Sequence, residues 1–145
     1  MIDYTLGFAF NKEMNRVILI KKNRPSWQAG LLNGVGGKVE SWDASPPAAQ
    51  AREFREETGI ETTPGEWKLF SSLNGDDFLV DCFWITLEDQ RFYDYESVTD
   101  EAVNQYSLIE LQAFQTCPNV PMLIAMCRNL DVQSNRFKHI ELTYK

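Results

Sequence analysis

GGKVE at Gly36–Glu40 and REFREETGI at Arg52–Ile60 are the two segments that decide the fold of this chain. On a helix of 3.6 residues per turn, Glu53, Glu56 and Glu57 fall within an arc of roughly 100°. Like charges at such spacings repel by about 0.2–0.5 kcal/mol per pair, and the helix dipole disfavours anions in the last turn. A divalent cation reverses both effects, because Mg²⁺ prefers carboxylate and phosphate oxygens as ligands. The segments therefore predict a metal site on a helix.

A solvated acidic surface is the alternative interpretation, since charge runs on helices usually face water. Three neighbouring features favour a site instead. Phe54 faces away from the glutamates and can anchor the helix, while Arg52 adjoins Glu53 and can orient a carboxylate. The Gly-Gly-Lys segment lets the backbone approach a phosphate or a metal closely.

The boundaries of this helix are well marked. Ser45 is a favoured N-cap residue, and Pro46 suits the first helical position because its missing N–H is not needed there. Gly59 suits the position just after the helix. We therefore expect a helix from Pro46 to about Thr58.

The rest of the chain alternates apolar runs with turn residues. Polar residues 11–15 predict a hairpin between the first two strands. The expected order is three extended segments, the helix described above, two strands, a loop, two helices and a last strand: Tyr4–Phe10, Arg16–Lys21 and Leu31–Val39; Trp67–Leu73 and Phe78–Leu87; Glu88–Val98; Ser107–Phe114 and Pro118–Leu130; Phe137–Tyr144. This order predicts an α+β protein, a three-layer α/β/α sandwich with a mixed sheet.

Length and charge limit the partners. The 145 residues fit one domain spanning 1–145, and 43% of them are hydrophobic. Lys and Arg total 14 against 21 Asp and Glu, a net charge of −7, which disfavours a nucleic-acid polymer or an anionic membrane as partner. The chain has no apolar run of the ~20 residues that span a bilayer. A small phosphorylated ligand remains compatible if metal ions supply positive charge.

The cysteines predict the compartment. Cys82, Cys117 and Cys127 are odd in number and have no CxxC spacing, which argues against disulfides and zinc and for a reducing compartment. The N-terminus Met1-Ile2-Asp3-Tyr4 lacks the basic region of a signal peptide. We therefore expect a cytoplasmic protein.

The two segments together resemble the Nudix box, G-x5-E-x7-R-E-U-x-E-E-x-G-U, in which U is an aliphatic or aromatic residue. The residues from Arg52 to Ile60 match it at fixed spacing, and Gly37 supplies the opening glycine. The resemblance implies a Nudix-type α/β/α sandwich. It also implies hydrolysis of a nucleoside diphosphate linked to another group, with Mg²⁺ or Mn²⁺ as the metal. Because many family members are dimers, it raises a homodimer as a further expectation.

One departure lies between the two segments. Asp43 occupies the position of the first glutamate of the box, six residues after Gly37, and Trp42 stands where a glycine is common. Eight residues separate Asp43 from Arg52, where the box has seven. One residue is therefore inserted after Asp43, and the segment 43–47 can absorb it most easily.

The resemblance assigns roles residue by residue. Glu56 and Glu57 are expected to bind the metal, and Glu53 to act as a ligand or as the general base. Arg52 would hold Glu53 in place. A downstream carboxylate, for which Glu101 is the candidate, would be a further ligand or the base. The Gly36 carbonyl would complete the metal shell, and the expected phosphate contacts are Lys38 and Lys22.

The substrate is open among several classes. Asn33, ahead of the Gly-Gly pair, and Asn119, in Asn-x-Pro, resemble base-reading residues of MutT-like members, and an amide can match a purine edge. Turn and N-cap roles are the ordinary alternatives. The leading hypothesis is a nucleoside triphosphate pyrophosphohydrolase acting on an oxidised or otherwise modified purine nucleotide. Hydrolysis of ADP-ribose, nucleotide sugars or dinucleotides is the alternative, followed by a non-catalytic nucleotide-binding module.

Overall fold

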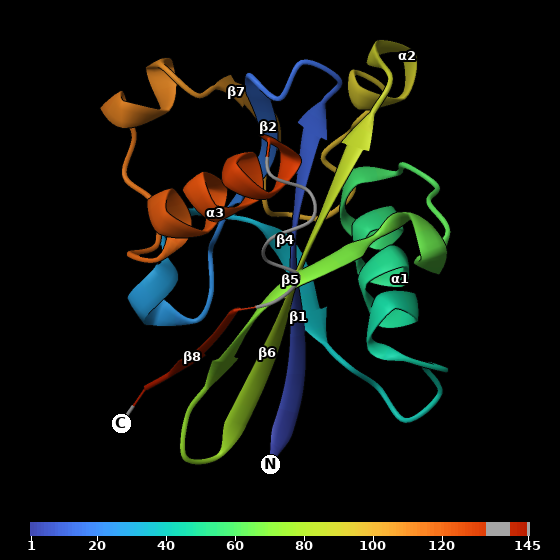
Figure 1. Ribbon diagram of the computed structural model, residues 1–145, viewed down its shortest axis with the longest axis vertical. Helices are drawn as coiled ribbons and strands as arrows, with labels where there is room; N and C mark the ends of the chain where they lie inside the picture. Colours follow the sequence, from blue (N-terminus) through green and yellow to red (C-terminus); the bar gives the residue numbers. More distant parts are fainter. Residues whose placement is uncertain (133–139, 145) are drawn as a thin grey trace.

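Within residues 1–132 and 140–144, which a computed structural model describes, eight strands form one mixed sheet (Figure 1). The order along the sheet is β3-β2-β1-β6-β5-β8, with β4 paired to β1 and β7 paired to β2. The pairs β1–β6 and β5–β8 are parallel, and the other pairs are antiparallel. The strands are β1 (Ile2–Asn11), β2 (Arg16–Lys21), β3 (Leu32–Asn33), β4 (Val35–Lys38), β5 (Lys68–Asn74), β6 (Phe78–Leu87), β7 (Val103–Ser107) and β8 (Ile140–Thr143).

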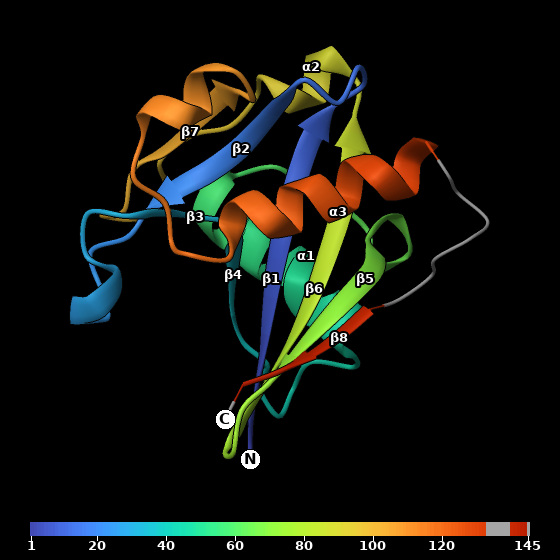
Figure 2. The same ribbon diagram turned by 60° about the vertical axis from the view of Figure 1, so that its left-hand side comes forward.

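Two long helices cover the two faces of this sheet, as the turned view in Figure 2 makes clear. These helices are α1 (Pro46–Thr58) and α3 (Val120–Val132). The shorter helices are α2 (Asp89–Phe92) and the 3-10 turns η1 (Ser26–Gln28), η2 (Pro64–Glu66) and η3 (Glu110–Ala113). The predicted α/β/α sandwich with a mixed sheet is therefore confirmed.

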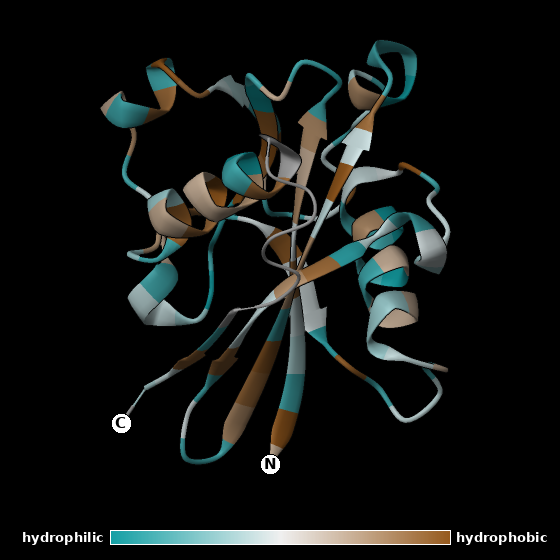
Figure 3. Ribbon diagram, in the orientation of Figure 1, coloured by the Kyte–Doolittle hydropathy of each residue, from teal (hydrophilic) through white to brown (hydrophobic). Residues whose placement is uncertain are grey.

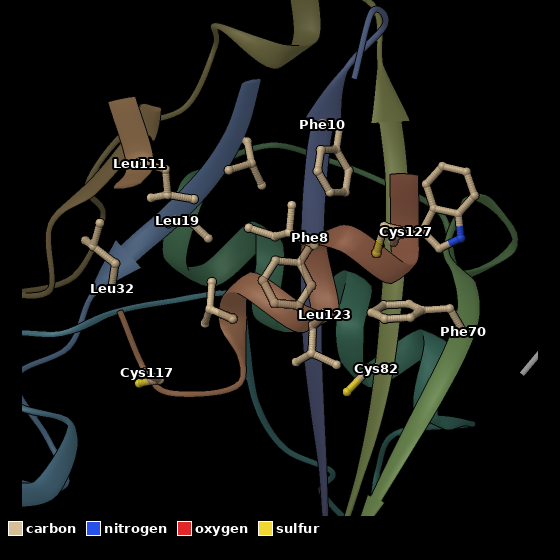
Figure 4. Close-up of a cluster of buried hydrophobic side chains, with 14 of the residues drawn as sticks. Phe8, Phe10, Leu19, Leu32, Phe70, Cys82, Leu111, Cys117, Leu123 and Cys127 are labelled. Carbon is tan, nitrogen blue, oxygen red and sulfur yellow. The ribbon is translucent and has the colours of Figure 1, made fainter. Parts of the chain in front are cut away.

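Each face of the sheet has its own hydrophobic core. Under α3, the buried side chains include Phe8, Phe10, Phe70 and Leu123, and Figure 4 places them between the helix and the central strands. The core under α1 is built by alternate residues of the same strands together with Phe54 of the helix. The central strands carry apolar residues on both faces, which gives them the hydrophobic colouring of Figure 3.

The first hairpin and the main helix follow the sequence. The amide oxygen of Asn11 accepts hydrogen bonds from the backbone N–H groups of Asn15 and Arg16, at 3.0 and 2.9 Å, which closes the predicted turn. The side chain of Ser45 accepts from the Ala48 N–H, and Gly59 adopts a left-handed conformation with φ of 79°. The predicted helix start and end are both confirmed.

Three elements differ from the sequence prediction. The predicted loop Glu88–Val98 contains the helical turn α2. The predicted helix Ser107–Phe114 is wrong over its first residues, because Ser107 ends the unpredicted strand β7 and only the turn η3 follows. The last predicted strand, Phe137–Tyr144, lies partly outside the described residues, and its described part is β8.

One sheet takes strands from both ends of the described chain. That residues 1–145 form one domain stays a prediction. Among the described residues, no helix has the length and apolar character needed to cross a membrane.

Candidate active site

Helix α1 has a buried apolar anchor, and its glutamates differ in exposure. Phe54 is fully buried and packs edge-on against Trp67, with 5.1 Å between ring centroids. The side chain of Glu53 is 14% exposed and that of Glu56 is 48% exposed. The interpretation of these glutamates as plain surface charge therefore fails for Glu53, which lies in a largely enclosed position.

Arg52 connects the parts of the site. Its NH1 atom donates to Glu53 Oε1 at 3.0 Å and to Glu56 Oε2 at 3.1 Å. Its NH2 atom reaches the backbone oxygen of Lys38 at 3.1 Å, which ties the helix to the end of β4. These contacts place Arg52 in the predicted position beside Glu53, although no contact with a substrate follows from them.

Asp43 completes the coordination of Arg52. Its two carboxylate oxygens accept from Nε and NH2 of Arg52 at 2.8 and 2.9 Å, a two-pronged pair that is among the strongest side-chain contacts. Asp43 Oδ2 also accepts from the Glu40 N–H at 2.8 Å, and the Asp43 N–H donates to the Glu40 oxygen at 3.0 Å. A tight turn therefore delivers the carboxylate to Arg52 despite the inserted residue.

The predicted site residues do not include Asp43. Its position six residues after Gly37 is the sequence signal that could have identified it as part of the site. The hydrogen bonds from Arg52 hold the pKa of Asp43 below its usual value, against the opposing effect of burial. The pair is therefore a source of stability that depends on pH.

We expect Asp43→Asn to lower the free energy of unfolding at pH 7 by about 1–3 kcal/mol, because a charge-assisted pair is lost. A carboxyl whose folded-state pKa is lowered contributes stability above its usual pKa of about 4, and loses it as the pH falls through the folded-state value. The difference in the free energy of unfolding between wild type and variant should therefore be constant from about pH 5 upward and shrink below about pH 4.

Urea unfolding at pH 7, 5 and 3.5 measures this difference. Asp76→Asn, at an exposed acid in the turn between β5 and β6, is the matched control and should leave stability unchanged at each pH. An Asp43→Asn protein that is as stable as wild type at pH 7 would refute a stabilising role for the pair.

Gly37 allows Glu53 to approach β4. A Cβ atom at Gly37 would lie 2.6 Å from the carboxyl carbon and Oε1 of Glu53, well inside contact distance. Burial raises the pKa of Glu53, and the nearby Arg52 opposes this shift. The helix and the strand thus enclose one carboxylate between them.

Glu57 is the least compensated group of the site. Its Oε2 atom is buried and has no hydrogen-bond partner among the described residues. Burial raises the pKa of Glu57 to about 7; Lys22 opposes this shift, while Glu53, Glu101 and Glu56 add to it. Three further carboxylates, those of Glu53, Glu56 and Glu101, are therefore close enough to Glu57 to raise its pKa.

Lys22 and Glu101 face this region from the other side. Lys22 Nζ lies 3.0 Å from Glu101 Oε1, and Glu101 is 4% exposed. Glu101 Oε2 accepts from the backbone N–H groups of Asn23 at 2.6 Å and Arg24 at 3.4 Å. Burial opposes ionisation of Glu101, yet these hydrogen bonds and Lys22 together keep its pKa below the usual value. Both oxygens of Glu101 are thus engaged within the protein.

The remaining predicted residues lie along β3, β4 and the start of α3. Gly36 sits in β4, where a Cβ would be 2.1 Å from the Thr5 oxygen, and Lys38 ends that strand with an exposed side chain. Leu32, next to Asn33, bridges Thr116, and Asn119 follows three residues later, just before α3. The side chain of Asn119 makes no hydrogen bond to the described part of the chain.

The carboxylates fit a divalent cation in charge and chemistry, because the buried oxygen of Glu57 lacks a partner and its neighbours are acidic. Over residues 1–132 and 140–144, no three Asp, Glu, His or Cys side chains are arranged to hold an ion by themselves. A bound ion would therefore also need oxygens from the backbone, from water or from a ligand, which is the usual situation for Mg²⁺.

Comparison with known proteins identifies the family of the chain. A family model described as NUDIX domain matches residues 4–113. The CTP pyrophosphohydrolase of Escherichia coli (strain K12) is 48% identical over 52 residues, which are 36% of this chain and 38% of that protein. The match thus spans well under half of the relative.

Two solved structures extend the likeness to the fold. The first comes from a study of MutT from Aliivibrio salmonicida and Vibrio cholerae; it has a TM-score of 0.68 and 22% identity, covering 88% of this chain and 96% of that chain. The second is an ADP-ribose pyrophosphatase from Streptococcus suis, with a TM-score of 0.71 and 17% identity, covering 97% of this chain and 98% of that chain.

The α/β/α sandwich defines a fold class, which the two solved structures share. Since the family model matches most of the chain, the protein belongs to the NUDIX domain family, as the resemblance implied.

Proposed function

We propose that this protein is a Mg²⁺- or Mn²⁺-dependent pyrophosphohydrolase that cleaves a nucleoside triphosphate to a nucleoside monophosphate and pyrophosphate. The observation that carries the proposal is the buried, unpartnered oxygen of Glu57 in a region that Glu53, Glu56 and Glu101 also influence. A protein gains nothing in stability from such an arrangement, so a ligand with positive charge is its reasonable purpose.

In this proposal Glu56 and Glu57 hold the metal, with Glu53, Glu101 and the Gly36 carbonyl as further ligands. The ion, when bound, polarises the phosphate and acidifies a water molecule. Arg52 keeps Glu53 oriented through its 3.0 Å contact, so that a free carboxylate oxygen can accept a proton from the attacking water. Glu101 is better suited to positioning Lys22 than to proton transfer, since both its oxygens are engaged.

Lys22 and Lys38 are the proposed phosphate contacts. Lys22 lies at the end of β2 beside Glu101, with its side chain 17% exposed, and Lys38 lies where β4 meets Arg52. An ammonium group acts on phosphate as a mobile point charge, which suits a leaving group whose charge increases.

Triphosphate is favoured as the substrate by the relative named CTP pyrophosphohydrolase, whose matched segment is 48% identical. That name suggests a pyrimidine base, whereas Asn33 and Asn119 led us to expect a modified purine. The solved structure of an ADP-ribose pyrophosphatase supports the alternative substrate class only through the fold. A non-catalytic module is the third hypothesis, and the intact Arg52–Ile60 motif argues against it.

A nucleotide panel with Mg²⁺ separates these hypotheses. It should hold CTP, the other common triphosphates, 8-oxo-dGTP, ADP-ribose and a nucleotide sugar. For a triphosphate substrate we expect free phosphate only after pyrophosphatase is added, together with a nucleoside monophosphate on chromatography. Turnover confined to ADP-ribose or sugars would select the alternative, and tight binding without turnover would select the module.

The proposal includes a cytoplasmic setting without a nucleic-acid or membrane partner. It is supported by three free, buried cysteines and by the net charge of −7. A homodimer remains an expectation from the family, and sedimentation analysis would test it.

A further inference from the structure

The turn η1 carries a chain of two side-chain amides that ends at Gln28. The Gly34 N–H donates to Asn33 Oδ1 at 2.8 Å, and Asn33 Nδ2 donates to Gln28 Oε1 at 3.3 Å. Because a backbone N–H can only pair with the oxygen of an amide, the first contact fixes the orientation of Asn33. The second contact then fixes the orientation of Gln28.

This arrangement leaves Gln28 Nε2 as the outer end of the chain. Both its N–H donors lack a protein partner in the described ranges, and the residue is half-buried rather than fully exposed. By contrast, Asn33 has already used its oxygen and one of its donors within the protein. The group that is free to meet a ligand is therefore the Gln28 amide nitrogen, which can only donate.

The loop that carries Gln28 is held against Lys22, the residue that contacts Glu101. The loop that carries η1 returns to β2 through two backbone bonds at Lys22, with Gly30 N–H to Lys22 O at 2.8 Å and Lys22 N–H to Leu31 O at 2.9 Å. Figure 2 shows this turn beyond the end of β2. Lys22 in turn contacts Glu101 and influences Glu57.

The hydrogen bonds from Gln28 through Asn33 also connect Gln28 to the segment that leads into β4. Asn33 is followed along the extended segment by Gly36, and three residues of strand span about 10 Å. A nucleotide whose phosphates lie at Gly36 and Gly37 can reach back along this distance with its base. The exposed Trp27 beside Gln28 adds an apolar face at the same end.

We propose that Gln28 is a specificity-determining residue that donates a hydrogen bond to an acceptor atom of the substrate's nucleobase, with Asn33 acting on the base only by orienting Gln28. The inference rests on the proposed function for its ligand, a nucleotide. It differs from a direct role of Asn33, because the free atom belongs to another residue and offers only donors.

The hydrogen bond from Asn33 to Gln28 allows the proposed role of Gln28 to be tested at either residue. In Gln28→Glu the outer end becomes an acceptor. In Asn33→Asp the donor to Gln28 is lost, so the Gln28 amide must turn to donate to Asp at position 33 and present Oε1 outward. Two chemically different substitutions therefore change the ligand-facing group at position 28 from a hydrogen-bond donor to an acceptor. Ser26→Ala, at an exposed residue of the same turn, is the matched control.

The measurement is calorimetric binding of AMP, GMP, CMP and UMP without metal, which does not depend on turnover. In wild type, one nucleotide should bind more tightly than the other three. For Gln28→Glu and Asn33→Asp we expect the ratio of its association constant to theirs to change about ten-fold or more, in the same direction. In a Gln28→Ala background, Asn33→Asp should change that ratio by less than about two-fold, because its effect passes through Gln28.

Three results would overturn the inference: no base preference in wild type, an unchanged preference in Gln28→Glu, or a full effect of Asn33→Asp in the Gln28→Ala background. The last result would assign the base contact to Asn33 itself. Mg²⁺-dependent turnover of wild type is measured separately. Base-selective binding without turnover would refute the proposed hydrolysis and leave the Gln28 inference standing.

Discussion

Glu57→Gln is expected to lower Mg²⁺-dependent turnover by more than about 100-fold, since losing groups that merely orient a metal ligand already costs about 10–100-fold. Glutamine keeps the shape of the side chain and removes its charge. The effect should appear with every nucleotide that the wild type hydrolyses, because Glu57 acts on the metal and the phosphates. Steady-state kinetics over a range of Mg²⁺ concentrations measures it.

The same substitution should stabilise the metal-free protein by about 1–3 kcal/mol at pH 8, because it removes a negative charge that burial disfavours, as the raised pKa of Glu57 of about 7 indicates. A loss of activity joined to a gain in stability is the mark of a functional group held at a structural cost. Glu61→Gln, at an exposed glutamate just after α1, is the control and should change neither property. Wild-type turnover in Glu57→Gln would refute the assignment of this residue.

Glu53→Gln is expected to lower turnover by about 10²–10⁴-fold, the usual contribution of a positioned proton acceptor, while the fold stays intact. The amide can still accept the 3.0 Å hydrogen bond from Arg52, so the helix should keep its contacts. Circular dichroism and thermal unfolding check the fold, and kcat measures the loss. Kinetics like those of wild type would contradict the role of Glu53.

Gly37→Ala tests the position of the same carboxylate without changing its charge. The added methyl group would meet Glu53 at 2.6 Å, so either the side chain or β4 must shift. We expect a large fall in kcat in a folded protein, while Gly65→Ala, where a Cβ has open space, should be neutral. An active Gly37→Ala protein would mean that the observed approach of Glu53 to β4 is unimportant.

The sequence predicts helix α1 well because several local signals agree there. Ser45, Pro46 and Gly59 fix the ends of α1 through contacts within a few residues, which a sequence displays directly. Apolar runs bounded by turn residues likewise mark β1, β2, β5 and β6. The sequence fails at β7, whose polar residues are extended because they pair with β2 across the fold.

The sequence predicts candidate site residues by type, but it does not predict the contacts between them. Asp43 seemed displaced by the insertion, and only the turn at Glu40 reveals that its carboxylate still reaches Arg52. Glu101 was predicted as a ligand or base, and its two engaged oxygens depend on backbone N–H groups that no spacing indicates. The sequence does not single out Gln28, because the free amide nitrogen of Gln28 depends on how the Asn33 side chain is oriented.

The central claim, that the acidic face of α1 binds a divalent cation through Glu57, is tested most directly by calorimetric titration of the metal-free protein with Mg²⁺. We predict saturable binding by wild type and by Glu61→Gln, and a loss of that binding in Glu57→Gln. Equal binding in wild type and Glu57→Gln would contradict the claim.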